Sequence, residues 1–142
     1  MTRFLTFAVF ALLPLLARGE SYICTTDMAT GFAYENGVWK QTRFNPDQKF
    51  IVRPATESER TLFALRGDRN TANVRWVVEP LGAYQIAYCS EDFKPNGELV
   101  CHGLIEEFRM NKNSLRFQWA YLSGYWDGGD TPMVGIGKCS PI

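Results

Sequence analysis

The sequence contains one histidine, His102, and any reactive role for it depends on the side chain across from it. If Lys112-Asn113 forms the turn of a hairpin, His102 faces Ser123 on the neighbouring strand. A serine beside a histidine is a pair that nucleophilic catalysis uses. Glu106, however, lies about 13 Å from the histidine along the same strand, too far to orient it. No G-x-S-x-G turn presents the serine either. The pair is therefore a weak basis for a hydrolase, and we expect a non-catalytic protein.

The same hairpin register collects aromatic side chains on one face, with Phe108 opposite Phe117 and Glu106 opposite Trp119. Apolar walls with a few polar groups are the usual makeup of a small-ligand site. The alternative is a plain barrel core, with a bulge at Gly103 turning the polar side chains out to water. The residues of the expected pocket are His102, Glu106, Trp119, Tyr121 and Ser123.

A second candidate surface consists of aromatic residues expected near strand ends. Tyr121, Tyr125, Trp126 and the pair Tyr34–Trp39 form a surface for a sugar or a protein if they are exposed, and core packing if they are not. Trp126 is the best candidate for exposure, because a strand gives way there to a loop.

Metal and cofactor chemistry have little support. One histidine and four cysteines expected to be oxidised leave no ligand set for zinc. The turn Asp127-Gly128-Gly129-Asp130 offers two carboxylates, but the spaced acids of a calcium loop are missing, so a solvated turn is the simpler interpretation. No glycine-rich loop opens a helix to hold a nucleotide. We expect neither a metal nor a cofactor.

The elements that position these residues are predicted to be almost entirely strands. Short alternating runs rich in Val, Ile, Phe, Tyr and Trp recur between turn signals. Residues Pro54–Glu59 and Gly67–Thr71 contain breakers and are expected to be loops. The pattern predicts an all-β fold, a small antiparallel β-barrel of about eight strands or a sandwich. The candidate strands are Ser21–Thr26, Gly31–Asn36, Val38–Phe44, Lys49–Arg53, Arg60–Arg66, Asn73–Glu79, Tyr84–Ser90, Glu98–Met110, Leu115–Trp126 and Met133–Lys138.

Two turns and four cysteines constrain how the strands pair. Asn36-Gly37 is a strong two-residue hairpin signal, which places Tyr34 opposite Trp39. If Phe93–Gly97 is the loop of another hairpin, Cys89 faces Cys101, and Cys24 is left to pair with Cys139. Four cysteines allow three pairings, so this pairing is the preferred one among them.

The N-terminal residues have the pattern of a secretory leader. Arg3 precedes an apolar run from Phe4 to Leu16, and Ala17-Arg18-Gly19 is a small-x-small cleavage site. A membrane anchor is the alternative, but the run is shorter than the ~20 residues that span a bilayer. We expect a cleaved signal peptide over residues 1–19 and one mature domain over residues 20–142, periplasmic or secreted and without a membrane span.

The charge balance bears on the partners. The chain has 15 basic and 15 acidic residues, and the basic ones are scattered rather than clustered. A nucleic-acid partner usually requires a basic stripe, so none is expected. We expect a monomer.

Several segments resemble an uncharacterised group of small exported proteins of Gram-negative bacteria: Tyr22-x-Cys24, Ala29-Thr30-Gly31-Phe32, Asn111-Lys112-Asn113-x-Leu115-Arg116-Phe117, Gly124-Tyr125 and Ile136-Gly137-Lys138-Cys139-Ser140. This resemblance implies a periplasmic location and carries over no catalytic residue. A looser likeness, through Tyr22-x-Cys24 and the barrel length, is to periplasmic inhibitors of C-type lysozyme. The expected function is a periplasmic binding or interaction module for a small molecule or a cell-envelope protein. The alternatives are an enzyme inhibitor of the lysozyme type, acting through surface loops, and the hydrolase based on His102 and Ser123.

Overall fold

The computed structural model describes residues 20–65, 73–82, 87–103, 107–126 and 131–142. Within them the chain forms nine strands and one helix. In chain order these are β1 (Tyr22–Glu35), β2 (Val38–Phe44), β3 (Lys49–Pro54), α1 (Glu57–Leu65), β4 (Trp76–Pro80), β5 (Ala87–Cys89), β6 (Glu98–Cys101), β7 (Glu107–Asn111), β8 (Arg116–Tyr121) and β9 (Met133–Pro141).

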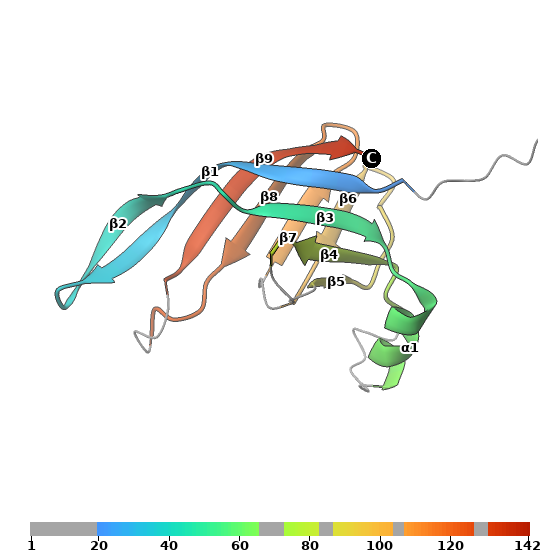
Figure 1. Cartoon of the computed structure of the whole chain (residues 1–142), viewed down its shortest axis with the longest axis horizontal. Helices are drawn as coiled ribbons and strands as arrows, with labels where there is room; N and C mark the ends of the chain where they lie inside the picture. The colour runs from blue at the N-terminus through green and yellow to red at the C-terminus, as the bar shows by residue number, and fades with distance from the viewer. Residues whose placement is uncertain (1–19, 66–72, 83–86, 104–106, 127–130) are drawn as a thin grey trace, which may run out of the picture.

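The strands form one antiparallel sheet in the order β5-β4-β3-β1-β9-β8-β7-β6, and β2 pairs with β1 beside this path. The two ends of the order meet, because Tyr88 of β5 and His102, just after β6, exchange two backbone hydrogen bonds of 2.8 Å. The sheet thus curves into a nearly closed eight-strand barrel (Figure 1). The all-β barrel expected from the sequence is confirmed.

Two disulfides hold this barrel. Cys89–Cys101 crosses the seam where β5 meets β6, next to the bridge between Tyr88 and His102. Cys24–Cys139 joins β1 to β9 and links residues 115 positions apart in the sequence. Both bridges are the pairs preferred from the sequence.

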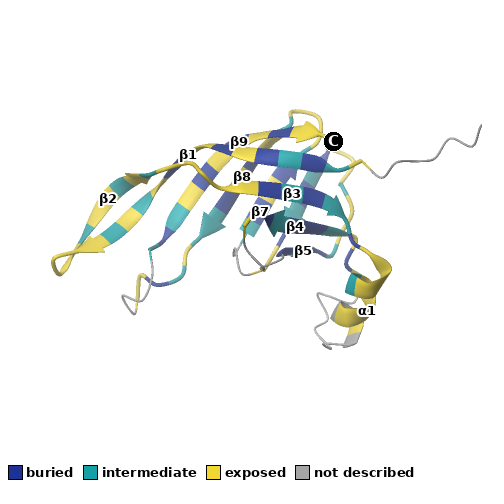
Figure 2. Ribbon diagram, in the orientation of Figure 1, coloured by how far each residue is buried: buried dark blue, intermediate teal, exposed yellow. Residues whose placement is uncertain are grey.

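Side chains fill the described part of the barrel interior. The ring of Phe50 lies 5.4 Å from that of Phe108, 5.7 Å from that of Phe117 and 6.1 Å from that of Trp119, measured between centroids. All four residues are almost completely buried. Buried and exposed residues alternate along the barrel strands, whereas the hairpin of β1 and β2 beyond the barrel is mostly exposed (Figure 2).

β1 is one strand of 14 residues, where the sequence pattern predicted two shorter strands. Its register against β9 shifts between Thr26 and Met28, which marks a bulge at Asp27. The extra residue reverses the alternation of side chains, so that Thr26 and Ala29 are both buried. Beyond the bulge, β1 continues past the barrel and pairs with β2 to form a projecting hairpin (Figure 1).

The turn of this hairpin is the one predicted. Asn36 and Gly37 have φ values of 52° and 82°, the positive pair that a type I′ turn requires. Tyr34 pairs with Trp39, and their ring centroids are 5.2 Å apart.

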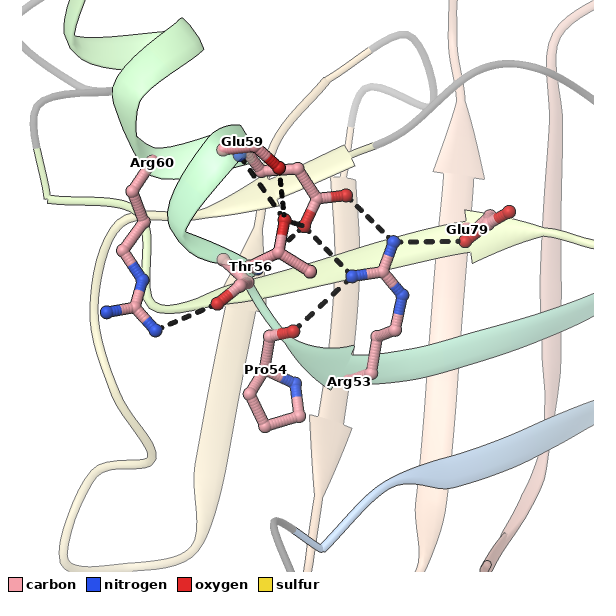
Figure 3. Close-up of polar contacts among 8 residues, drawn as sticks. Arg53, Pro54, Thr56, Glu59, Arg60 and Glu79 are labelled. Atoms are coloured by element: carbon pink, nitrogen blue, oxygen red, sulfur yellow. Dashed lines mark hydrogen bonds and ion pairs between the residues drawn. The ribbon is translucent and has the colours of Figure 1, made fainter.

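The prediction of a loop over Pro54–Glu59 and a strand over Arg60–Arg66 is wrong, because α1 begins at Glu57. Thr56 and Glu59 form a capping box: the Thr56 N–H donates to Glu59 Oε2 at 2.8 Å, and the Glu59 N–H donates to Thr56 Oγ1 at 3.3 Å (Figure 3). Arg53 of β3 donates to both carboxylate oxygens of Glu59, at 2.8 and 2.9 Å. The T-x-x-E spacing from Thr56 to Glu59 is the sequence signal for this helix.

The predicted register around Lys112-Asn113 is also wrong. Phe108 pairs with Trp119 rather than with Phe117, a shift of two residues. The turn is longer because Asn111 Oδ1 accepts hydrogen bonds from the backbone N–H groups of Asn113 and Ser114, at 2.9 and 3.1 Å. A shift of two residues keeps the same side chains on the inner face, so the predicted core survives the wrong pairing.

Candidate binding surface

The predicted pair of His102 and Ser123 is not formed. The strand that begins at Glu98 ends at Cys101. His102, the next residue, is exposed and pairs with Tyr88 of β5. Ser123 is half-buried and follows β8, and β7 lies between β8 and β6 in the sheet. The geometry therefore gives the hydrolase no support.

The aromatic members of the predicted pocket belong to the core or its margin. The indole N–H of buried Trp119 donates to the buried Thr26 Oγ1 at 3.2 Å. Tyr121 is half-buried and packs against the core. Glu106 lies outside the described residues, so a ligand pocket on this face stays a prediction.

Three aromatic rings meet on the outer face of the projecting hairpin. The centroid of the Trp39 ring lies 5.2 Å from that of Tyr34 and 5.1 Å from that of Tyr125, which follows β8. We call Tyr34, Trp39 and Tyr125 the aromatic cluster. Tyr34 and Tyr125 are exposed, and the adjacent Trp126 is 75% exposed, as predicted for that position.

Exposed apolar side chains continue from the aromatic cluster along the outer face of β1 and β9. Met28 pairs with Ile136, and Thr30 pairs with Val134, so every second residue of each strand adds to this face. We call the exposed residues Met28, Phe32, Leu122, Val134 and Ile136 the apolar strip. A recess of about 210 Å³ lies within it, lined by Phe32, Leu122 and Val134 together with Thr30, Gly31, Gln41, Pro132 and Met133.

The part of the strip on β9 was not predicted from the sequence, because this strand has its apolar residues on the outer face rather than on the inner one. Gly135 and Gly137 occupy the inner face, where a Cβ at Gly135 would overlap the Trp119 ring and one at Gly137 would overlap the Thr25 carbonyl. The apolar residues between the glycines, Val134 and Ile136, therefore point outward. A glycine at every second position of a strand is the signal that marks such a close approach.

A second recess, of about 680 Å³, adjoins the strip at Met28 and Ile136 and has a mixed polar and apolar lining. Its lining includes Glu98, Arg109, Arg116 and Lys138. Arg109 donates to Glu107 at 2.7 Å and so lowers the pKa of that carboxyl below its usual value. Arg116 and Lys138 lie directly opposite each other on β8 and β9.

Within the described parts of the chain, no three His, Cys, Asp or Glu side chains gather to hold a metal ion. The turn Asp127-Gly128-Gly129-Asp130 lies outside those parts. No helix in the described residues is long and apolar enough to cross a membrane.

Comparison with known protein families, with curated proteins and with solved structures finds no match to this chain. The exposed aromatic and apolar surface is therefore the evidence from which we infer a function.

Proposed function

We propose that this chain is an exported, non-catalytic binding protein that docks a protein of the cell envelope through its aromatic cluster and apolar strip. The observation that carries the proposal is the continuity of exposed apolar side chains across β9, β1 and the segment after β8, with the half-buried Trp39 of β2 between Tyr34 and Tyr125. Single exposed apolar residues are ordinary, but a contiguous set of them marks an interaction surface.

A protein partner fits this surface better than a small molecule does. Small ligands bury most of their area in concave sites of about 300–1,000 Å³. The recess within the apolar strip is smaller, at about 210 Å³, and the aromatic cluster lies on and beside a hairpin that projects from the barrel (Figure 1). Tyr and Trp are enriched at the centres of protein interfaces, where a few large side chains supply most of the binding free energy. Trp39 lies between Tyr34 and Tyr125, at the centre of the aromatic cluster, and is the residue we expect to contribute most to binding.

The disulfides support the exported location. Structural disulfides persist in oxidising compartments such as the periplasm and are rare in the cytosol. Together with the leader predicted over residues 1–19, Cys24–Cys139 and Cys89–Cys101 favour a chain that works outside the cytosol.

Inhibition of an enzyme is the second candidate, and the projecting hairpin favours it. A two-residue tip at Asn36-Gly37 on a narrow pair of strands has the shape to enter a substrate cleft. The test is the rate of C-type lysozyme with the purified protein in micromolar excess. An unchanged rate would remove lysozyme as the target.

Site-specific photo-cross-linking in the periplasm tests the main proposal. A photoreactive phenylalanine analogue at Tyr125 should give a discrete adduct with another protein. The matched control places the analogue at Leu62 of α1, which is about as exposed as Tyr125. Tyr125 contacts Trp39 of the hairpin, and α1 lies at the end of the molecule opposite that hairpin (Figure 1). Equal labelling from both positions, or none from Tyr125, would count against a docking surface at the cluster.

A further inference from the structure

Among the described residues, no strand lies beside the outer edge of β2. In that part of the chain β2 pairs with β1 alone, along Val38–Phe44. Glu35 and Val38 flank a two-residue turn and so form a hydrogen-bonded pair, and such pairs alternate along an antiparallel ladder. The outward N–H and C=O groups of β2 are therefore those of Trp39, Gln41 and Arg43. Among these groups the Arg43 carbonyl accepts one long hydrogen bond, of 3.4 Å, from the Thr42 hydroxyl. A row with so few partners is a template for another strand.

We propose that a second copy of this chain binds this edge, with β2 pairing antiparallel to β2 about a two-fold axis at Gln41. This register is the one that overlaps all seven residues of the strand. It sets Gln41 opposite its own copy and Trp39 opposite Arg43 of the second copy, twice by symmetry. Trp39, Gln41 and Arg43 all direct their backbone N–H and C=O groups outward. Each of these groups therefore faces a hydrogen-bonding partner on the second copy.

The side chains in this register are self-complementary. The exposed Arg43 lies beside the Trp39 ring of the second copy, a pair that attracts through the cation–π interaction. On the other face, exposed Val38 meets Phe44, and Lys40 meets Thr42. No like charges are opposed, whereas an axis at Lys40 would set that lysine against its own copy, which is destabilising.

The rest of the chain leaves room for this arrangement. The tip of the second hairpin, Asn36-Gly37, comes level with Asn45 and Pro46. It stops short of Lys49, the first residue of β3. From there on the outer edge of β3 is already occupied by β4 and by Leu81, whose N–H donates to the Lys49 carbonyl at 2.8 Å. The hairpin projects from the barrel (Figure 1). Pairing of two such hairpins therefore sets the two barrels at opposite ends of a four-stranded bridge.

The two-fold axis also brings the binding surfaces together. Directly opposed residues share a face of a sheet, so both aromatic clusters lie on the same side of the bridge. The protein is then a dimer rather than the monomer expected from the sequence. The pairing needs no assumption about what the aromatic cluster binds, so it can hold or fail independently of the proposed function.

A cysteine at the axis tests the register. In an antiparallel hydrogen-bonded pair the Cα atoms are about 5.5 Å apart, within the range that a disulfide spans. Gln41→Cys should therefore give a covalent dimer under mild oxidation, with the native bridges verified by mass spectrometry. The matched control is Arg43→Cys, whose copy lies about 13 Å away along the strand and should stay uncoupled. A Gln41→Cys protein that stays monomeric, or equal coupling of both variants, would overturn the pairing.

The mass of the native protein in solution tests the dimer itself. Sedimentation of the protein purified from the periplasm should give twice the mass of the mature chain. Gln41→Pro should give the single mass, because proline removes the outward N–H and leaves the bonds to β1 intact. The matched control Gln41→Ala keeps the N–H and should stay dimeric. A single mass for the unmodified protein, or a Gln41→Pro dimer, would contradict the proposal.

Discussion

Replacing Glu59 with glutamine should destabilise α1 strongly at neutral pH and very little in strong acid. Hydrogen bonds from Arg53 are the main cause that lowers the pKa of the Glu59 carboxyl from 4.5 to about 2. Burial opposes this shift, and the bonds from Thr56 add to it. Arg53 also holds Glu79, at 3.3 Å, so it keeps an acidic partner in the variant (Figure 3).

The size of the effect follows from the shift. One pKa unit corresponds to about 1.4 kcal/mol, so a fall from 4.5 to about 2 corresponds to about 3 kcal/mol of stabilisation. The Glu59 side chain is 17% exposed, which limits screening by solvent. The folded pKa lies below the unfolded one, so this stabilisation is fully present above about pH 4.5. It is lost as the pH falls from there to about 2.

Amide hydrogen exchange within α1 measures this stabilisation locally. At pH 7, Glu59→Gln should reduce the protection of the helix amides by about a hundredfold, and near pH 2 the variant and the parent should differ by about twofold. The matched control is Glu57→Gln in the same turn, because Glu57 is 85% exposed and pairs with Arg60 only at 3.6 Å. Its effect should stay below about 0.5 kcal/mol. Equal effects of the two variants at pH 7, or a Glu59→Gln effect that persists in acid, would refute the reasoning.

Three further changes test the barrel, each read from the free energy of unfolding in urea. Replacing Cys24 and Cys139 with serine opens a loop of 115 residues and should cost about 5 kcal/mol, about 2 kcal/mol more than opening the shorter disulfide at the seam. Thr26→Val leaves the buried Trp119 N–H without its acceptor and should cost about 1–3 kcal/mol, whereas Thr26→Ser should be milder. Gly135→Ala forces a methyl group into the Trp119 ring and should cost about 3 kcal/mol, and no loss of stability would show that the ring is free to move.

The sequence predicts best where a structure depends on neighbouring residues. Asn36-Gly37 alone determines a turn and the pairing of Tyr34 with Trp39, because few residues tolerate two successive positive φ values. The helix obeys an equally local rule, the capping box of Thr56 and Glu59. It was missed because nine residues are too few to show a clear apolar period.

The binding surface was predicted only in part, because its assembly depends on contacts between distant segments. Tyr34, Trp39 and Tyr125 are named from the sequence, but their meeting depends on how the segment after β8 approaches the hairpin. The apolar strip further requires the bulge at Asp27, which sets the face on which Met28 lies. No local signal reveals a bulge in one strand when its partner lies a hundred residues away.

Loss of the Trp39 side chain tests the docking surface most directly. Trp39→Ala, introduced beside the photoreactive residue at Tyr125, should abolish the cross-linked adduct, because truncating an interface anchor costs about 2 kcal/mol or more, at least about a thirtyfold loss of affinity. Intact disulfides and an unchanged far-UV spectrum would show that the barrel remains folded. An adduct of undiminished yield from the folded Trp39→Ala protein would contradict the claim that the aromatic cluster is where this protein binds its partner.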